Sequence, residues 1–139
     1  MRAQNEAQPF ALKCRVYYED TDAGGIVYHA SHIRFFERGR TEFLRALGFS
    51  QSQTADRAAA DALLFTVRRL TVDYLRPARL DDLLTVETQL VTAHGPRLEL
   101  RQRLLRGEEA IATAEVLVAA VGGNGRPRRI PAELIARMT

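Results

Sequence analysis

The segment from Tyr17 to His32 gathers acids, histidines and aromatic residues around the pair Gly24-Gly25. It lies between a predicted strand and the start of a predicted helix. The N–H groups at a helix start lack intrahelical partners and lie at the positive end of the helix dipole, so they can polarise a carbonyl or hold an oxyanion. A carboxylate beside them could attack that carbonyl or activate water. Acids before helices are also common caps and paired glycines common turns, so the residues alone leave a catalytic and a structural interpretation open.

The helix that follows is predicted from about Ala30 to Leu47, because apolar residues recur there at helical spacing. These residues are Ile33, Phe36, Phe43, Leu44 and Leu47. Gly48 stands where a left-handed C-cap is expected. Gly39 costs about 1 kcal/mol in a helix interior, so it is expected to permit close packing against a sheet or a partner. Arg40 points into the apolar arc, and we expect an ion pair with Glu37 one turn earlier.

Alternating apolar residues predict five strands, one before the helix and four after it. Their approximate ranges are 11–18, 63–74, 84–90, 98–104 and 110–121. A change of phase predicts a β-bulge at Arg68-Arg69. The last strand is apolar on nearly both faces and is expected in the middle of the sheet. A short helix is predicted from Pro131 to Met138, with proline near its first turn. One long helix on an antiparallel sheet is an α+β architecture, and because it covers only part of five strands we expect a dimer.

The composition favours an ordinary globular protein. At 139 residues the chain predicts one domain, 1–139, and its apolar stretches are too short for a membrane span. The residues before Phe10 lack the apolar core of a secretory signal, so we expect a cytoplasmic location. One cysteine, Cys14, excludes an internal disulfide or a cysteine-rich metal site. The net charge of +3 is spread along the chain, which argues against nucleic-acid binding.

The chain resembles a known enzyme family in the run from Tyr17 to His29, in Ala30-Ser31 and in the stretch Phe36-Glu37-Arg38-Gly39-Arg40-Thr41-Glu42. These residues are similar to the signature of YbgC-type acyl-CoA thioesterases in the 4-hydroxybenzoyl-CoA thioesterase family. The predicted order of elements agrees, so the resemblance covers nearly the whole chain. It implies a hotdog fold, in which a five-stranded antiparallel sheet wraps around one long helix. It also implies homodimers or homotetramers with active sites at the subunit interface.

The resemblance further implies the roles of individual residues. Asp22 falls on the family's catalytic aspartate and is expected to act as nucleophile or general base. The backbone near Gly25 and His29 corresponds to the helix start that polarises the thioester. His29 either orients water or substrate, or is only hydrogen-bonded in place. The substrate, a small or medium acyl-CoA, is expected to contact Tyr28, Gly24 and Ile26. Neither a cofactor nor a metal ion is implied.

Other interpretations of these residues stay open. Glu19 and Asp20 are expected to be solvated or turn-forming, while His32 could join His29 and Asp22 as metal ligands. A hotdog dehydratase would use a histidine, His29 or His94, and a carboxylate across the substrate. A non-catalytic acyl-CoA-binding module of a cell-envelope complex would use the same cleft without turnover.

The connection 50–61 could shape the acyl pocket. The phosphate groups of coenzyme A are expected to be bound by arginines, which form bidentate hydrogen bonds with them. The candidates are Arg68, Arg69, Arg97 and Arg101.

Overall fold

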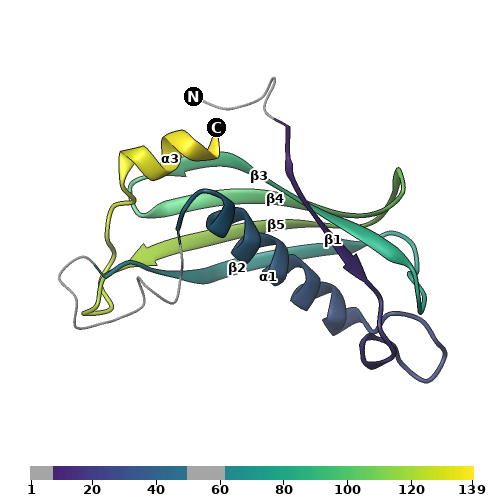
Figure 1. Cartoon of the computed structure of the whole chain (residues 1–139). Coiled ribbons are helices and arrows are strands. Elements are labelled where there is room, and N and C mark those ends of the chain that lie inside the picture. Colours follow the sequence, from purple (N-terminus) through teal and green to yellow (C-terminus); the bar gives the residue numbers. More distant parts are fainter. Residues whose placement is uncertain (1–7, 50–61) are drawn as a thin grey trace.

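The computed structural model describes residues 8–49 and 62–139, so the connection 50–61 lies outside the described residues. The elements are β1 (Phe10–Arg15), a 3-10 turn (Tyr18–Asp20), α1 (His29–Ala46), β2 (Leu64–Tyr74), β3 (Leu83–His94), β4 (Arg97–Arg106), β5 (Glu109–Val121) and α3 (Ala132–Met138). Figure 1 shows α1 lying across the curved sheet. None of the described helices is long and apolar enough to cross a membrane.

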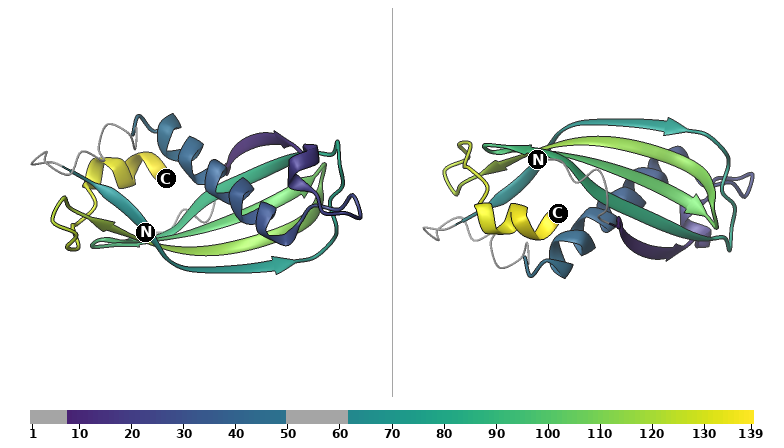
Figure 2. Two further views of the ribbon diagram at one scale, coloured as in Figure 1. Left: turned by 90° about the horizontal axis from the view of Figure 1, so that it is seen from below. Right: turned by 90° about the horizontal axis from the view of Figure 1, so that it is seen from above.

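The five strands form one antiparallel sheet in the order β1-β3-β4-β5-β2. The helix α1 packs mainly on β1, β3 and β4. The two views in Figure 2 show both helices on the same side of the sheet, whose other side they leave uncovered. The predicted α+β arrangement, a five-stranded antiparallel sheet around one long helix, is therefore confirmed. The strand β2 forms one edge of this sheet and has no neighbour beyond it among the described residues.

The helix α1 has nearly the predicted bounds, and Gly48 follows it with a φ of 90°, as expected of a left-handed C-cap. Phe36, Phe43 and Leu44 are buried as predicted. Ile33 was wrongly placed in the buried arc, since 38% of it is exposed, whereas Phe35 is fully buried. The sheet covers the side of the helix that carries Phe35 and Phe36, which displaces the buried arc from Ile33.

The helix approaches the sheet most closely at Gly39, as the sequence predicted. A Cβ atom at this position would lie 2.5 Å from Cγ1 of Val86 and 3.2 Å from both Nε2 of Gln102 and Oγ1 of Thr88. Val86, Thr88 and Gln102 are fully buried in β3 and β4. Only glycine therefore allows α1 to lie at this depth.

We expect Gly39→Ala to lower the free energy of unfolding by roughly 1 to 3 kcal/mol, because overpacking at Val86 outweighs the better helix propensity of alanine. Chemical denaturation measures the effect. Arg38→Ala, at an exposed position of the same helix, is the control and should change stability by at most about 1 kcal/mol, the size of its exposed contact with the Phe35 ring. A Gly39→Ala protein as stable as the wild type would contradict the close packing.

The strands follow the predicted ranges with two corrections. The first strand ends at Arg15 rather than at Tyr18, because the chain turns there into the 3-10 turn and leaves Tyr18 exposed. The last strand is paired on both sides, but β4 and not β5 occupies the middle of the sheet. The predicted bulge in β2 is confirmed by a register shift between Val67 and Arg69.

Candidate active site

Asp22 lies in a short hairpin that joins the 3-10 turn to α1. An isolated bridge pairs Thr21 with Val27, and the N–H of Asp22 donates to the carbonyl of Ile26 at 2.9 Å. The turn closes through Gly25, whose N–H donates to the carbonyl of Asp22 at 3.0 Å and whose φ is 78°. The carboxylate of Asp22 is exposed and accepts the N–H of Gly24 at 2.9 Å. The hairpin thus presents one carboxylate to solvent in a defined orientation.

Asp20 forms two hydrogen bonds next to this hairpin. Of the two expected alternatives, solvated or turn-forming, the structure shows the second: Asp20 is 2% exposed and closes the 3-10 turn. Its Oδ2 accepts the N–H of Tyr17 at 2.8 Å, and its carbonyl accepts the N–H of Tyr28 at 3.0 Å. The first bond closes the 3-10 turn, and the second joins the residue before the hairpin to the residue after it. The position of Asp22 relative to the helix start is therefore set by Asp20.

The start of α1 carries no side-chain cap among the described residues. Its N-cap residue is Tyr28, and the first N–H groups, those of His29 and Ala30, have no acceptor within the helix because of helix geometry. His29 is exposed at the first helical position, with its ring 4.3 Å from that of Tyr28. The carbonyl of His29 accepts the hydroxyl of Tyr74 from β2 at 2.8 Å. An uncapped positive helix end thus faces outward beside the Asp22 hairpin.

His32 is a structural histidine rather than a partner of Asp22. It is 4% exposed, and its Nδ1 lies 3.2 Å from the carbonyl of Tyr28 and 3.3 Å from that of His29. Burial lowers its pKa, so the ring is neutral at neutral pH. In the part of the chain that the structure describes, no three histidine, cysteine or acidic side chains come together as a metal site.

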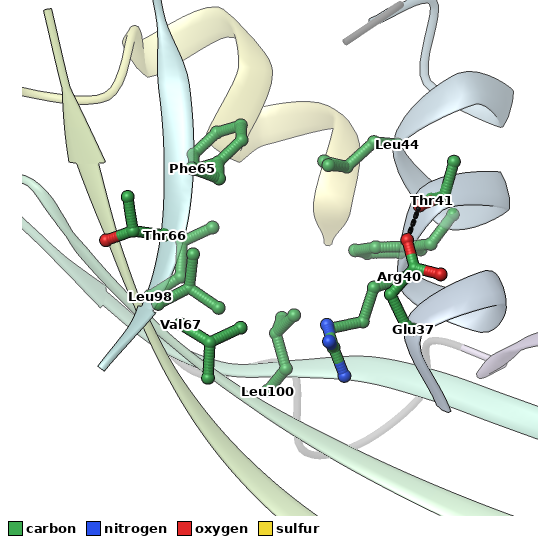
Figure 3. A pocket seen from close by; sticks show the side chains of 11 residues that line it. Glu37, Arg40, Thr41, Leu44, Phe65, Thr66, Val67, Leu98 and Leu100 are labelled. Atoms are coloured by element: carbon green, nitrogen blue, oxygen red, sulfur yellow. Dashed lines mark hydrogen bonds between the residues drawn. The ribbon is translucent and has the colours of Figure 1, made fainter. Parts of the chain in front are cut away.

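A pocket of about 150 Å³ opens between the second half of α1 and the β2 side of the sheet. Figure 3 shows its two walls, with Leu44, Thr41, Arg40 and Glu37 on the helix facing Phe65, Thr66, Val67, Leu98 and Leu100 on the sheet. Phe43 and Val118 complete the lining. Most of these side chains are apolar, so the pocket suits a hydrocarbon group.

Arg40 brings a charge into this pocket. Its Nη1 donates to Oε1 of Gln102 at 3.0 Å, and burial lowers the pKa of its guanidinium, an effect that the charge of Glu37 partly offsets. The expected ion pair with Glu37 is wrong: that carboxylate accepts the hydroxyl of Thr41 at 3.0 Å instead. Among the described residues, Arg40 forms no ion pair.

The pocket and the Asp22 hairpin lie at opposite ends of the helix. Along α1, Arg40 is about 16 Å from His29, at about 1.5 Å per residue. Neither Asp22 nor His29 lines the pocket. The arginine candidates for phosphate binding do not line this pocket either, and Arg101 is an exposed residue of β4. Arg68, Arg69 and Arg97 surround a separate hollow beside Leu117, on the face of the sheet opposite α1.

Sequence reasoning grouped Asp22, Gly24, Gly25 and Ile26, and the structure joins them in one hairpin next to the helix start of Tyr28 and His29. It missed two residues. Tyr74 reaches His29 from β2, and only the alternation of that strand could have indicated that it faces the helix. Gln102 occupies an inward position among leucines of β4, where a polar residue signals a buried partner.

Comparison with known proteins adds independent findings. A family model described as the thioesterase-like superfamily matches residues 16–138. The acyl-CoA thioester hydrolase YbgC of Escherichia coli is 45% identical over 129 residues, which cover 91% of this chain and 93% of that protein. A probable thioesterase from Bartonella henselae has a TM-score of 0.82 at 42% identity, covering 87% of this chain and 98% of that one.

A thioesterase from Thermus thermophilus, solved with coenzyme A and zinc, has a TM-score of 0.80 at 25% identity, covering 96% of this chain and 93% of that one. The solved thioesterases share the arrangement of sheet and helix described above. The hotdog fold that the sequence resemblance implied is therefore confirmed.

Proposed function

The chain belongs to the thioesterase-like superfamily, and on that premise we propose that it hydrolyses acyl-CoA thioesters to a free acid and coenzyme A, with Asp22 as nucleophile or general base. One observation carries this proposal: an exposed carboxylate, oriented by the N–H of Gly24, stands beside an uncapped helix start. A carboxylate and unpaired N–H groups are the two elements that attack and polarisation of a carbonyl require.

In the proposed reaction the N–H groups at the start of α1 donate to the thioester oxygen and stabilise the negative charge that develops on it. Asp22 then either attacks the carbonyl, giving a mixed anhydride that water cleaves, or removes a proton from an attacking water. In both routes the thiolate of coenzyme A leaves and takes up a proton. Gly25 helps because a Cβ at this position would meet no atom of the described residues within 4 Å, so the main chain there is open to a substrate.

The substrate is expected to pass along the exposed surface of the hairpin and the helix start. Tyr28 is exposed there beside His29, and Gly24 and Ile26 belong to the same turn. We propose that these three residues contact the thioester and its nearest methylene groups. His29, exposed at the first helical position, orients the substrate or the attacking water.

We propose that the working unit contains a homodimer formed through β2, whose outer edge is unpaired among the described residues. An unpaired strand of this length is a template for another strand. Val67, 47% exposed, and Tyr74 supply apolar surface along it. Antiparallel pairing about a twofold axis sets the start of one β2 opposite the end of the other. The pocket beside Val67 would then adjoin the helix start held by the partner subunit's Tyr74.

This assembly would resolve the separation of hairpin and pocket within one chain. The acyl group, bound at the helix start of one subunit, would extend into the apolar pocket of the other. We therefore propose an active site shared between two subunits; two dimers could pair further into a tetramer. The proposed location is the cytoplasm, and the unpaired Cys14 fits a reducing compartment.

The test of this function is the release of free thiol from short, medium and aromatic acyl-CoAs by the purified full chain. We expect turnover on at least one class of acyl-CoA, without added metal or cofactor. An equal release with and without the protein on every substrate would refute the proposal. Retained binding of coenzyme A in that case would favour the binding module over the enzyme.

A further inference from the structure

The pocket between α1 and β2 contains a charged group that the hydrolytic reaction does not use. The proposed chemistry takes place at the hairpin and the helix start, whereas Arg40 extends into the pocket about three helical turns away (Figure 3). Around it lie the apolar side chains of Phe43, Leu44 and Leu100. A pocket for plain alkyl chains gains nothing from a guanidinium, because a desolvated charge is costly unless it is paired.

The orientation of Arg40 is fixed by a buried amide. Gln102 is fully buried, and its Nε2 donates to the carbonyl of Phe36 and to Oγ1 of Thr88, both at 2.9 Å. Because the amide nitrogen is committed to these two acceptors, its oxygen must point to Arg40, which donates to it at 3.0 Å. The guanidinium is therefore held in place before any ligand arrives.

The partner that holds Arg40 does not neutralise it. Gln102 is an uncharged acceptor, and within residues 8–49 and 62–139 Arg40 forms no ion pair. Glu37 lines the same pocket and its charge partly offsets the lowering of the Arg40 pKa by burial, but its carboxylate accepts the hydroxyl of Thr41 rather than a guanidinium N–H. A guanidinium carries five N–H donors, of which Gln102 receives one. A positioned, partly desolvated arginine with donors that no other described residue receives is well suited to bind a carboxylate, through short charge-assisted hydrogen bonds.

We propose that Arg40 is a specificity-determining residue, which makes this pocket select acyl chains that end in an oxygen acceptor, above all a carboxylate, over plain alkyl chains of equal length. The inference rests on the proposed function, since it assigns the pocket to the acyl group. The pocket has a volume of about 150 Å³. The preferred substrates are therefore monothioesters of dicarboxylic acids, and short ones are tested first.

The experiment compares adipoyl-CoA with hexanoyl-CoA, which have the same number of acyl carbons and differ at the far end. The measured quantity is the ratio of their kcat/KM values in the wild type, in Arg40→Met and in Arg40→Lys. We expect Arg40→Met to lower the adipoyl-to-hexanoyl ratio at least about tenfold, since a site built for a polar group discriminates strongly while an apolar pocket does not. Arg40→Lys, which keeps the charge, should restore part of the preference. Glutaryl-CoA and pentanoyl-CoA repeat the comparison at one carbon less.

The ratio separates a change of specificity from a general loss of activity, because a misfolded variant loses activity on both substrates equally. Arg38→Met is the matched control: this exposed arginine of the same helix lies over the ring of Phe35 rather than in the pocket, and its ratio should equal that of the wild type. An unchanged ratio in Arg40→Met would overturn the inference. So would an equal loss of both activities together with loss of the dimer, which would make Arg40 an interface residue. If the wild-type protein were inactive on both substrates, the proposed function itself would be contradicted.

Discussion

Asp22→Asn is expected to lower kcat for acyl-CoA hydrolysis by about three powers of ten or more, while the protein stays folded. Loss of a nucleophile or of the base that activates water has effects of this size. The amide keeps an oxygen that can accept the N–H of Gly24, so the hairpin should retain its shape. Asp22 is exposed, and its replacement should change the free energy of unfolding by less than about 0.5 kcal/mol.

The measurement is thiol release at saturating acyl-CoA, with thermal unfolding recorded on the same samples. Glu19→Gln is the matched control, since Glu19 is another exposed carboxylate of the same segment and its removal changes the net charge equally. It should retain nearly full activity. If Asp22→Asn and Glu19→Gln are equally active, Asp22 is neither nucleophile nor base, whatever substrate the enzyme hydrolyses.

Val67→Glu is expected to convert the proposed dimer into a monomer. Val67 is 47% exposed in the single chain, so the substitution should leave the subunit fold intact. In a dimer formed through β2, each of two new carboxylates would be desolvated at the interface, at a cost of several kcal/mol that pairing with Arg40 of the same pocket would only partly offset. Each 1.4 kcal/mol raises the dissociation constant tenfold, so we expect an increase of at least about a hundredfold.

Light scattering over a range of concentrations gives the molar mass in solution and so measures the dissociation of the dimer directly. Ala11→Glu is the matched control, because Ala11 is an exposed residue of β1, the strand at the opposite edge of the sheet. It should leave the mass unchanged. Val67 also lines the pocket, so activity alone does not test the interface. A Val67→Glu dimer as tight as that of the wild type would exclude β2 as the subunit contact.

Much of the fold could be predicted because its signals are local. The spacing of apolar residues in α1, the left-handed Gly48 and the phase change at Val67 are consequences of backbone geometry within a few residues. The errors arose where a distant element decided the outcome. Ile33 and Phe35 both have helical neighbours at suitable spacing, and only the position of the sheet determines that Phe35 is the buried one.

The candidate site divides in the same way. By itself the sequence determined the hairpin of Asp22 and the helix start at His29, because those residues are neighbours in the chain and short-range hydrogen bonds hold them together. Only the tertiary structure decided the pairing of Arg40 with Gln102, 62 residues apart, and of Tyr74 with His29, 45 residues apart. Such contacts depend on the register of the sheet and the depth at which α1 packs on it, and these follow from the combined packing of the whole core rather than from any local pattern.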